Sequence, residues 1–395
     1  MLYFTNKKSQ CTGCGACLAV CPTKCINFVS DEEGFLYPEA DSNCINCGKC
    51  ESVCPVANRK ETISKDFTKY CVAALHRDRN IWEKSSSGGA FSAICKAFCG
   101  DEGAIFGTRF ERLDVVHDYV YGADNIGDFR KSKYVQSEIR DNYIKVKDIL
   151  ENKEKVLFSG TPCQVAGLKN FLGKEYENLL CVDLICHGVG SPDVFKKYIK
   201  YLGEKHSSKV ISYTFRNKKA KMGRLLEYVV RVEFENGLII EDDSDSYNIA
   251  FLQALFLRPS CGECLFANRN RLGDITIGDF KKKYEILSKL KEFENFSTVI
   301  VNTKKGAKIF EKALESLKVF PVNIEDILKT NPPLSAPSKI NAERESFFDD
   351  LNNGMPIDKA LRKYITKPGL LTYIWIHLPD RFRSKIKRWL KWIKR

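Results

Sequence analysis

From residue 70 onwards, short apolar runs alternate with amphipathic stretches. Short apolar runs predict buried strands, and apolar residues at helical spacing predict helices. Strands are predicted over 103–107, 156–158, 179–185, 211–215, 226–234, 238–241, 274–278 and 299–301. Helices are predicted over 90–98, 164–172, 247–257 and 304–317, with another that begins after Ser191. Because strands alternate with helices, the pattern predicts an α/β sheet, and the hairpin signal Asn236-Gly237 makes it a mixed one.

Both ends of the chain depart from this pattern. Residues 1–60 lack the alternation and form a separate module, which a polar linker over 58–69 follows. Prolines at 332, 333 and 337 mark a second boundary, after which 346–364 has the composition of a polar helix. We therefore predict an α+β protein with three parts, which cover residues 1–60, 70–330 and 336–395.

Composition narrows the class of protein. The chain has 395 residues, 44% of them hydrophobic and 29% charged, which is ordinary for a soluble globular protein. Its 17 cysteines, without a secretory signal, favour a reducing cytoplasm and metal ligation over disulfides. No apolar run approaches the roughly 20 residues of a membrane span. Much of the net charge of +13 lies at the C-terminal end, and since no recognition motif accompanies it we expect no nucleic-acid partner.

Two cysteine runs with the same spacing lie near the start of the chain. Each reads C-x-x-C-x-x-C-x-x-x-C-P. Bacterial ferredoxins hold 4Fe–4S clusters with this spacing, and the cysteine before proline ligates the other cluster. Glycines between the ligands let the backbone wrap closely. We therefore predict two clusters, one held by Cys11, Cys14, Cys17 and Cys54 and the other by Cys44, Cys47, Cys50 and Cys21.

The alternatives to clusters are a zinc site or a disulfide scaffold. Zinc prefers paired C-x-x-C knuckles with four ligands per ion, which a tripled run fits poorly. Cys25 lies just beyond the first run and has no place in the scheme, so we interpret it as a packed thiol.

Three later loops carry a second group of cysteines. Residues 160–163 and 186–188 each follow a predicted strand, and the third loop is 261–264. Ligands bind at the carboxyl ends of strands in such sheets, so the first two loops are expected to face one crevice. Four thiols suit a third 4Fe–4S cluster, a structural zinc ion, or separate buried positions. The candidates are Cys163, Cys186, Cys261 and Cys264.

Three other features have a functional and a structural interpretation. Residues 85–89, Ser-Ser-Ser-Gly-Gly before an apolar helix, suit a phosphate cradle or a flexible linker. His187 could bind metal, shuttle protons or simply form hydrogen bonds. Four further thiols are expected to be packed in the core: Cys71, Cys95, Cys99 and Cys181.

Taken together, the motifs identify a family resemblance. They read SSSGG, SKYVQS, SGTPCQVAGL, DLICHGVGSP, CGECLFANR and GDITIGDF, and begin at Ser85, Ser132, Ser159, Asp183, Cys261 and Gly273. In this order they resemble the coenzyme F420 hydrogenase/dehydrogenase β-subunit family over about residues 70–330. The N-terminal ferredoxin-type module is a frequent fusion in the bacterial branch of that family.

The resemblance implies FAD and a 4Fe–4S cluster within a mixed-sheet α/β flavin-binding domain. It also implies that Cys163, Cys186, Cys261 and Cys264 hold this inner cluster, and that residues 274–279 lie near the same crevice. The implied flavin contacts are Ser86, Ser87, Gly88, Gly89, Lys133, Tyr134, Gln136, Ser137, Gly160 and Thr161.

We expect an iron–sulfur flavoprotein oxidoreductase that passes electrons between its clusters and FAD, and then to or from a small-molecule or F420-like substrate. The flavin would join one-electron and two-electron steps. Bacterial members often accompany surface-polysaccharide genes, which suggests a role in that chemistry. The alternative is an electron carrier that serves a separate enzyme.

The C-terminal segment, residues 370–395, combines aromatic and basic side chains. This composition suits either a peripheral membrane contact or a helix docked on its own domain.

Overall fold

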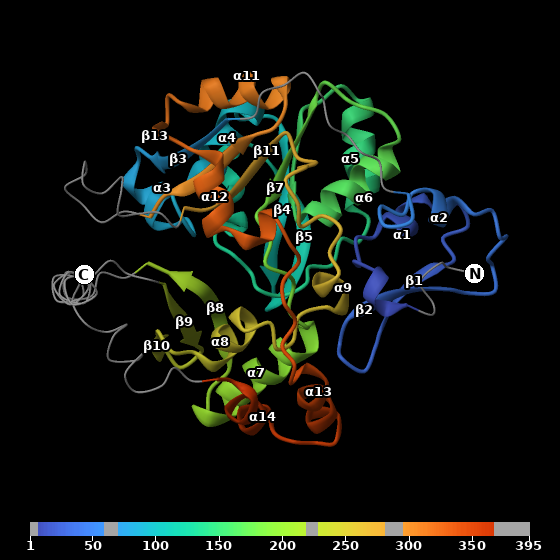
Figure 1. The fold of residues 1–395 in the computed structure, drawn as a ribbon, viewed down its shortest axis with the longest axis vertical. Coiled ribbons are helices and arrows are strands. Elements are labelled where there is room, and N and C mark those ends of the chain that lie inside the picture. The colour runs from blue at the N-terminus through green and yellow to red at the C-terminus, as the bar shows by residue number, and fades with distance from the viewer. Residues whose placement is uncertain (1–6, 59–69, 219–227, 281–294, 367–395) are drawn as a thin grey trace, which may run out of the picture.

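The computed structural model describes residues 7–58, 70–218, 228–280 and 295–366 (Figure 1). An eight-stranded mixed sheet lies at its centre, in the order β13-β3-β12-β11-β7-β6-β4-β5. The inner strands β4, β6, β7 and β11 run parallel, and the outer strands pair antiparallel with their neighbours. The strands are β3 (Tyr70–His76), β4 (Ala104–Glu111), β5 (Asp114–Tyr121), β6 (Val156–Gly160), β7 (Leu179–Leu184), β11 (Ile275–Asp279), β12 (Ser297–Val301) and β13 (Leu317–Val322).

Each face of this sheet has its own hydrophobic core, because successive strand residues point to opposite sides. Ile105 of β4 packs on one face with α4 and α11, whereas its neighbour Phe106 packs on the other with α5 and α6. The four helices are α4 (Ala90–Cys99), α11 (Lys304–Ala313), α5 (Asn142–Glu151) and α6 (Pro162–Leu172). Shorter elements are α3 (Arg79–Glu83), η2 (Ala123–Phe129), α9 (Pro259–Gly262), α12 (Ile324–Thr330) and η3 (Pro332–Leu334).

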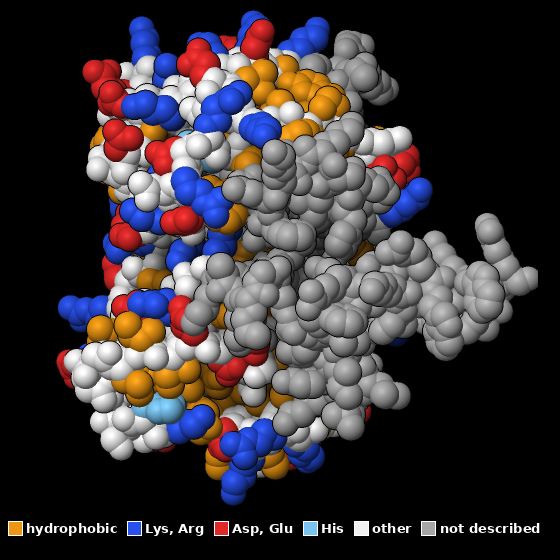
Figure 2. Space-filling view, turned by 90° about the vertical axis from the view of Figure 1, so that its left-hand side faces the viewer, with side chains coloured by type: hydrophobic (Ala, Val, Ile, Leu, Met, Phe, Trp, Pro, Cys, Tyr) orange, Lys and Arg blue, Asp and Glu red, His pale blue; other side chains and the backbone are white. Residues whose placement is uncertain are grey.

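A second layer lies below the large sheet in Figure 1. It consists of the antiparallel sheet β10-β9-β8 and four helices that share one core. Its elements are β8 (Val210–Asn217), β9 (Val229–Phe234), β10 (Ile239–Asp242), α7 (Pro192–Lys205), α8 (Ser246–Leu252), α13 (Arg344–Asn352) and α14 (Ile357–Tyr364). Figure 2 views the molecule from the left-hand side of Figure 1 and shows hydrophobic side chains gathered on the lower part of that face. A cavity in this layer has an empty volume of ≈ 930 Å³ and is lined by side chains that include Tyr198, Leu202, Phe234, Ile240 and Leu361.

The N-terminal module packs against both layers. Phe35 is fully buried in the core of the second layer, and Ala16 and Val53 belong to the core around α5 and α6. A module of this size buries little apolar surface by itself, so the rest of the chain completes its core. Its elements are η1 (Lys8–Gln10), α1 (Ala16–Val20), β1 (Ile26–Ser30), β2 (Leu36–Ala40) and α2 (Lys49–Ser52).

Several sequence predictions differ from the structure. The helix predicted over 247–257 ends at Leu252, because the chain turns at Ala254, whose φ is 57°. Three strands of the large sheet, β3, β5 and β13, were not predicted. The single helix predicted over 346–364 is two helices, since Gly354 has a φ of 87° and Pro356 follows it.

The C-terminal part predicted over 336–395 is not separate in its described portion. Phe347 and Leu361, on α13 and α14, are fully buried in the core of the second layer. The predicted linker lies outside the described residues from position 59, and the aromatic basic segment lies outside them from position 367. No helix among the described residues is long and apolar enough to cross a membrane.

Candidate electron-transfer site

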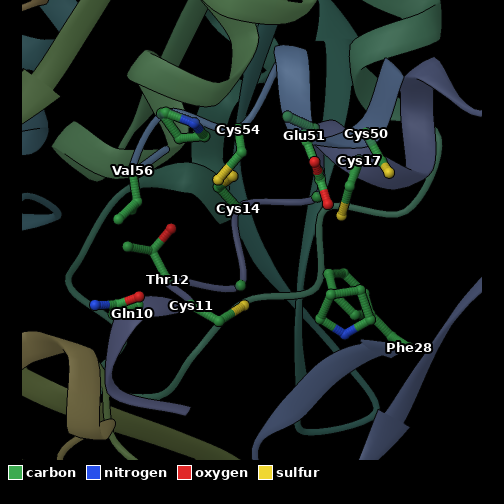
Figure 3. Close-up of a pocket in the computed structure, with 15 residues that line it drawn as sticks. Gln10, Cys11, Thr12, Cys14, Cys17, Phe28, Cys50, Glu51, Cys54 and Val56 are labelled. Carbon is green, nitrogen blue, oxygen red and sulfur yellow. The ribbon is translucent and has the colours of Figure 1, made fainter. Parts of the chain in front are cut away.

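The first cysteine group surrounds a pocket in the N-terminal module (Figure 3). The pocket has an empty volume of ≈ 450 Å³ and is lined by five cysteines. Three come from the first run and two from the second: Cys11, Cys14, Cys17, Cys50 and Cys54. The four thiols of the predicted crossed set therefore lie together, with Cys50 of the other predicted set beside them. We call this the outer pocket.

Two glycines shape the loop that carries these thiols. Gly13 and Gly15 have φ values of 67° and 81°, a region that favours residues without a Cβ. A Cβ on Gly13 would lie 2.2 Å from Nε2 of Gln136, so glycine is also required for the approach to the large domain. Burial raises the pKa of the Cys14 thiol to about 12, with nearby thiols acting in the same direction. Positive charge, such as that of iron, is needed to stabilise thiolates there.

The second group is less enclosed. Cys21, Cys44 and Cys50 pack around the small core of Cys25 and Ile26 together with Cys17 of the first group, and Cys47 is exposed. Cys25 is buried, as expected for a packed thiol, and its Sγ lies 3.5 Å from Sγ of Cys21. Burial acts to raise the pKa of the Cys21 thiol, but hydrogen bonding to Thr23 and Cys25 outweighs it and lowers this pKa to about 7.

The four later cysteines, expected from three separate loops, also line one pocket. It has an empty volume of ≈ 630 Å³ and we call it the inner pocket. Cys163 comes from the first turn of α6, Cys186 from the loop after β7, and Cys261 from α9. Cys264 follows α9 and completes the set. The order of β6, β7 and β11 in the sheet brings these loops together, which spacing along the chain does not specify.

The donor chemistry of the inner pocket fits an iron–sulfur cluster. Burial raises the pKa of Cys163 to about 11 and of Cys261 to about 12, and burial together with the other thiols raises that of Cys186. Four partly buried soft donors in one pocket suit a group that supplies positive charge. Among the described residues, no three His, Cys, Asp or Glu side chains are arranged to hold a single metal ion.

The two pockets are neighbours. Thr12 lines both of them. A Cβ on Gly167 would lie 2.9 Å from Sγ of Cys14, so the thiol of Cys14, which lines the outer pocket, packs directly against α6. Cys163 precedes Gly167 by one helical turn, about 6 Å. Charge can therefore pass between the pockets over a short distance.

The predicted flavin contacts fall into two groups. Ser86 Oγ lies 3.0 Å from Oγ of Ser132, and Ser87 Oγ lies 3.1 Å from Oγ of Ser297. Gly88 packs against the sheet, since a Cβ there would lie 2.0 Å from the carbonyl oxygen of Ala74. These residues lie between the large sheet and the second layer, together with Gly89 and Tyr134.

The other group lies at the inner pocket. Gln136 and Thr161 line it, and Gly160 precedes Thr161 at the end of β6. Ser137 Oγ accepts a hydrogen bond from Nε2 of Gln164 (3.0 Å). These side chains therefore lie with the inner cysteines, apart from the Ser/Gly turn.

Lys133 has a local role. Its Nζ donates to three backbone carbonyls of its own loop, those of Asp128 (2.6 Å), Arg130 (3.0 Å) and Lys131 (3.3 Å). Burial lowers its pKa to about 7. The ammonium group thus braces the loop that presents Ser132 and Tyr134.

A group of charges lies beside the Ser/Gly turn, which we call the basic junction: Lys131, Arg216, Lys218 and Asp279. Sequence reasoning placed Asp279 near the crevice but missed the three basic residues. Arg216 Nη1 lies 2.8 Å from Oδ2 of Asp279, and Lys218 Nζ donates to the carbonyls of Trp82 and Ser87. Burial and the neighbouring Arg216 lower the pKa of Lys218 to about 7. The basic run over 216–221 was the available sequence signal.

Two other candidates have structural roles. His187 has Phe251 O at 3.2 Å from Nε2 and Ser338 Oγ at 3.2 Å from Nδ1, which matches the hydrogen-bonding interpretation. Asp274 accepts from the backbone N–H of Cys181 (2.9 Å) at the opposite end of β11 from Asp279. The expectation that all of 274–279 lies near one crevice is therefore wrong at Asp274. The four other thiols are buried, as predicted: Cys71, Cys95, Cys99 and Cys181.

The stability of this region is expected to depend on His117. Burial lowers the pKa of His117 from 6.5 to about 4, while its ring meets Ser137 Oγ (3.0 Å) and Ser159 O (3.1 Å). Because the folded pKa lies below the unfolded one, its contribution is complete above pH 6.5 and is lost as the pH falls towards 4. We expect a loss of about 3 kcal/mol between pH 7 and pH 4. Urea unfolding at several pH values, compared with His117→Gln, measures it; equal pH slopes would contradict it.

Comparison with known proteins agrees with these two regions. Residues 153–326 match the family model that describes the C-terminal region of the coenzyme F420 hydrogenase/dehydrogenase beta subunit. The match covers less than half of the chain and shows that this region is similar to that family. Residues 10–58 match a 4Fe–4S dicluster domain, so the chain carries iron–sulfur clusters of the ferredoxin type, and its region 153–326 is related to an oxidoreductase subunit. The resemblance seen in the sequence is confirmed.

Solved structures similar to this chain include one described as a xenon derivative of the F420-reducing NiFe hydrogenase complex from Methanosarcina barkeri. The identity is 18%, the match covers 76% of this chain and 93% of that chain, and the TM-score is 0.44. Comparison with curated proteins gave no match.

Proposed function

We propose that this chain is an iron–sulfur flavoprotein oxidoreductase with two outer clusters, one inner cluster and FAD. The observation that carries the proposal is the meeting of four cysteines from distant loops in the inner pocket, next to the outer pocket. When bound, FAD would supply the exchange between one-electron transfer and a two-electron, hydride-type step. The substrate would be a small molecule or an F420-like deazaflavin, with surface-polysaccharide synthesis as the proposed setting.

The basic junction supports the flavin part of this proposal. Three basic groups lie there, Lys131, Arg216 and Lys218; Asp279 pairs with Arg216, and Glu233 acts on Lys131. Burial lowers the pKa of Lys131, and Arg231 adds to that effect. A bound diphosphate would offset this crowding of buried positive charge. Tyr134 and Tyr228 lie beside Arg216 and offer aromatic faces.

The distance from the basic junction to the inner pocket is short enough for electron transfer. Ser132, which meets Ser86, and Gln136, which lines the inner pocket, are four residues apart in the chain. Four residues span at most about 14 Å even when fully extended. A flavin at the basic junction would therefore lie within a short reach of an inner cluster.

Anaerobic purification with iron, sulfide and flavin analysis tests the function. Three clusters and one flavin require about twelve irons and one FAD per chain. About eight irons would remove the inner cluster. Full iron without flavin would favour an electron carrier that serves a separate enzyme. Zinc in place of iron would overturn the proposal.

Lys218→Gln tests the flavin position. The substitution removes a partly buried positive charge beside the Ser/Gly turn, so we expect FAD to bind about tenfold more weakly, which corresponds to the loss of one charge-assisted hydrogen bond. Fluorescence titration of the flavin-stripped chain measures the affinity. Lys200→Gln is the control, because Lys200 is an exposed residue of α7. Equal affinities in the two variants would contradict the assignment.

A further inference from the structure

Arg258 differs from the other buried arginines of the described chain. It is 0% exposed, and no carboxylate within the described ranges forms an ion pair with it. The other three each pair with a carboxylate: Arg216 with Asp279, Arg271 with Asp183, and Arg344 with Glu33. A guanidinium group stays protonated in proteins, and a buried charge without a counter-charge is costly. The position therefore calls for an anion that is not an amino-acid side chain shown in the structure.

The hydrogen bonds of Arg258 are made to neutral oxygens of two parts of the chain. Nη1 donates to Oε1 of Gln136 (2.8 Å) in the large domain. Nε donates to the carbonyl of Cys11 (2.7 Å), and Nη2 to the carbonyl of Leu36 (3.0 Å), both in the N-terminal module. The ring of Tyr37 also lies 4.1 Å from the guanidinium carbon. These contacts hold the side chain in place without neutralising it.

The guanidinium lies between the two cysteine pockets. Cys11, whose carbonyl it binds, lines the outer pocket, and Gln136 lines the inner one. Cys261 of the inner pocket donates its backbone N–H to the carbonyl of Arg258 (2.9 Å). Although burial raises the pKa of the Cys261 thiol to about 12, the charge of Arg258 acts in the opposite direction. A single cation is thus adjacent to both groups of thiols.

We propose that Arg258 is a positioning residue whose charge is balanced by the clusters in the outer and inner pockets, and that it favours the reduced state of both. This inference rests on the proposed cluster sites. Four thiolates make such a cluster a net anion, and reduction adds one more negative charge. Net charge and hydrogen bonding set cluster potentials, so a buried cation nearby raises them.

The electron balance is simple. When one electron passes between the two clusters, one is oxidised and the other is reduced, and no proton is transferred. Because Arg258 lies beside both, the added negative charge is next to the cation before and after the step. Its bonds to Cys11 and Leu36 also fix the module that carries the outer pocket against the large domain.

Arg344 provides a matched control. It is also a buried arginine that holds the N-terminal module, through two bonds to the carboxylate of Glu33 and one from Nε to the carbonyl of Leu257 (2.9 Å). Unlike Arg258, it bonds to no residue that lines either cysteine pocket, and its charge is already paired. Loss of Arg344 therefore weakens docking without removing a cation from the clusters.

Redox titration followed by electron paramagnetic resonance tests the proposal on the anaerobically loaded full chain. We compare Arg258→Met, Arg258→Lys and Arg344→Met with the wild type. At a fixed applied potential, Arg258→Met is expected to show an approximately tenfold lower ratio of reduced to oxidised cluster, about 59 mV for one electron. Arg258→Lys, which keeps the charge, should stay within about threefold of the wild type, and so should Arg344→Met.

The remaining outcomes also decide the matter. If Arg258→Met takes up no iron while Arg258→Lys loads fully, the positive charge is what the sites require, and the proposal stands. If both variants lack iron alike, or if Arg258→Met and Arg344→Met shift the ratio equally, Arg258 acts only through packing and the proposal is overturned. A wild-type chain without clusters would instead overturn the proposed function.

Discussion

Serine in place of Cys163 is expected to lower the iron content from about twelve to about eight atoms per chain. Cys163 lies in the first turn of α6 and lines the inner pocket. Burial raises its pKa to about 11, although backbone N–H groups of that turn act in the opposite direction, so its thiolate needs a positively charged group such as iron. A hydroxyl is a poorer, harder ligand for iron in this setting. The inner cluster, and with it the connection from the outer pocket to the flavin, should be lost.

Electron transfer measures the consequence. Even changes around the ligands of a metal site cost 10–100-fold, so loss of a ligand should slow flavin reduction through the clusters by more than about 100-fold. Anaerobic stopped-flow absorbance at the flavin band, with chemically reduced N-terminal clusters, reports the rate. The control is Cys95→Ala, since Cys95 is buried in α4 on the far face of the sheet. Cys163→Ser with full iron content and the wild-type rate would refute the inner cluster.

Valine in place of Gly167 is expected to separate the outer pocket from α6. A Cβ at this position would lie 2.9 Å from Sγ of Cys14 and 3.2 Å from the hydroxyl oxygen of Tyr143. Both neighbours are buried, so the added methyl groups can be placed only if the Cys14 loop moves. We expect a destabilisation of about 1–3 kcal/mol and loss of the cluster that Cys14 would hold. Chemical unfolding together with iron analysis measures both effects.

The control for this substitution is Gly127→Val. Gly127 lies in η2, and a Cβ there would meet nothing within 4 Å. Its effect on the free energy of unfolding should stay within about 0.5 kcal/mol. If Gly167→Val retained full iron and unfolded like the control, the close contact between Cys14 and α6 would not matter for cluster binding.

Both predictions depend on the docking of the N-terminal module. The module contributes Phe35 to the core of the second layer and Cys14 to the core around α6. Cluster ligands are therefore part of the packing between modules, and substitutions at this interface should affect iron content and stability together. Exposed Cys47, in contrast, is expected to affect iron content with little effect on packing.

Sequence alone was sufficient for features that depend on local spacing. The cysteines at 11, 14 and 17 lie on one tight loop, and the cysteine before a proline joins the other group, so these four thiols could be predicted to meet, whereas the presence of Cys50 in the same pocket could not. The thiols that follow β6 and β7 could be predicted to meet, because the carboxyl ends of parallel strands share one edge of a sheet. Helices with strong terminal signals, such as α6 and its end at Gly173, were also predicted closely.

The tertiary structure decided which distant groups are neighbours. Arg258 bonds to Cys11 across 247 positions of the chain, and no spacing rule relates two such residues. The sequence marks Gly167 as an ordinary helical glycine, and only the folded chain shows that the N-terminal module packs against it. The charges of the basic junction come from separate elements, and α13 and α14 read as polar helices although they complete a core. Local patterns in the sequence specify loops and helix ends. Which buried charges are neighbours, and which residues pack closely, depends instead on the order of the strands and on the docking of the N-terminal module, and only the folded chain determines these.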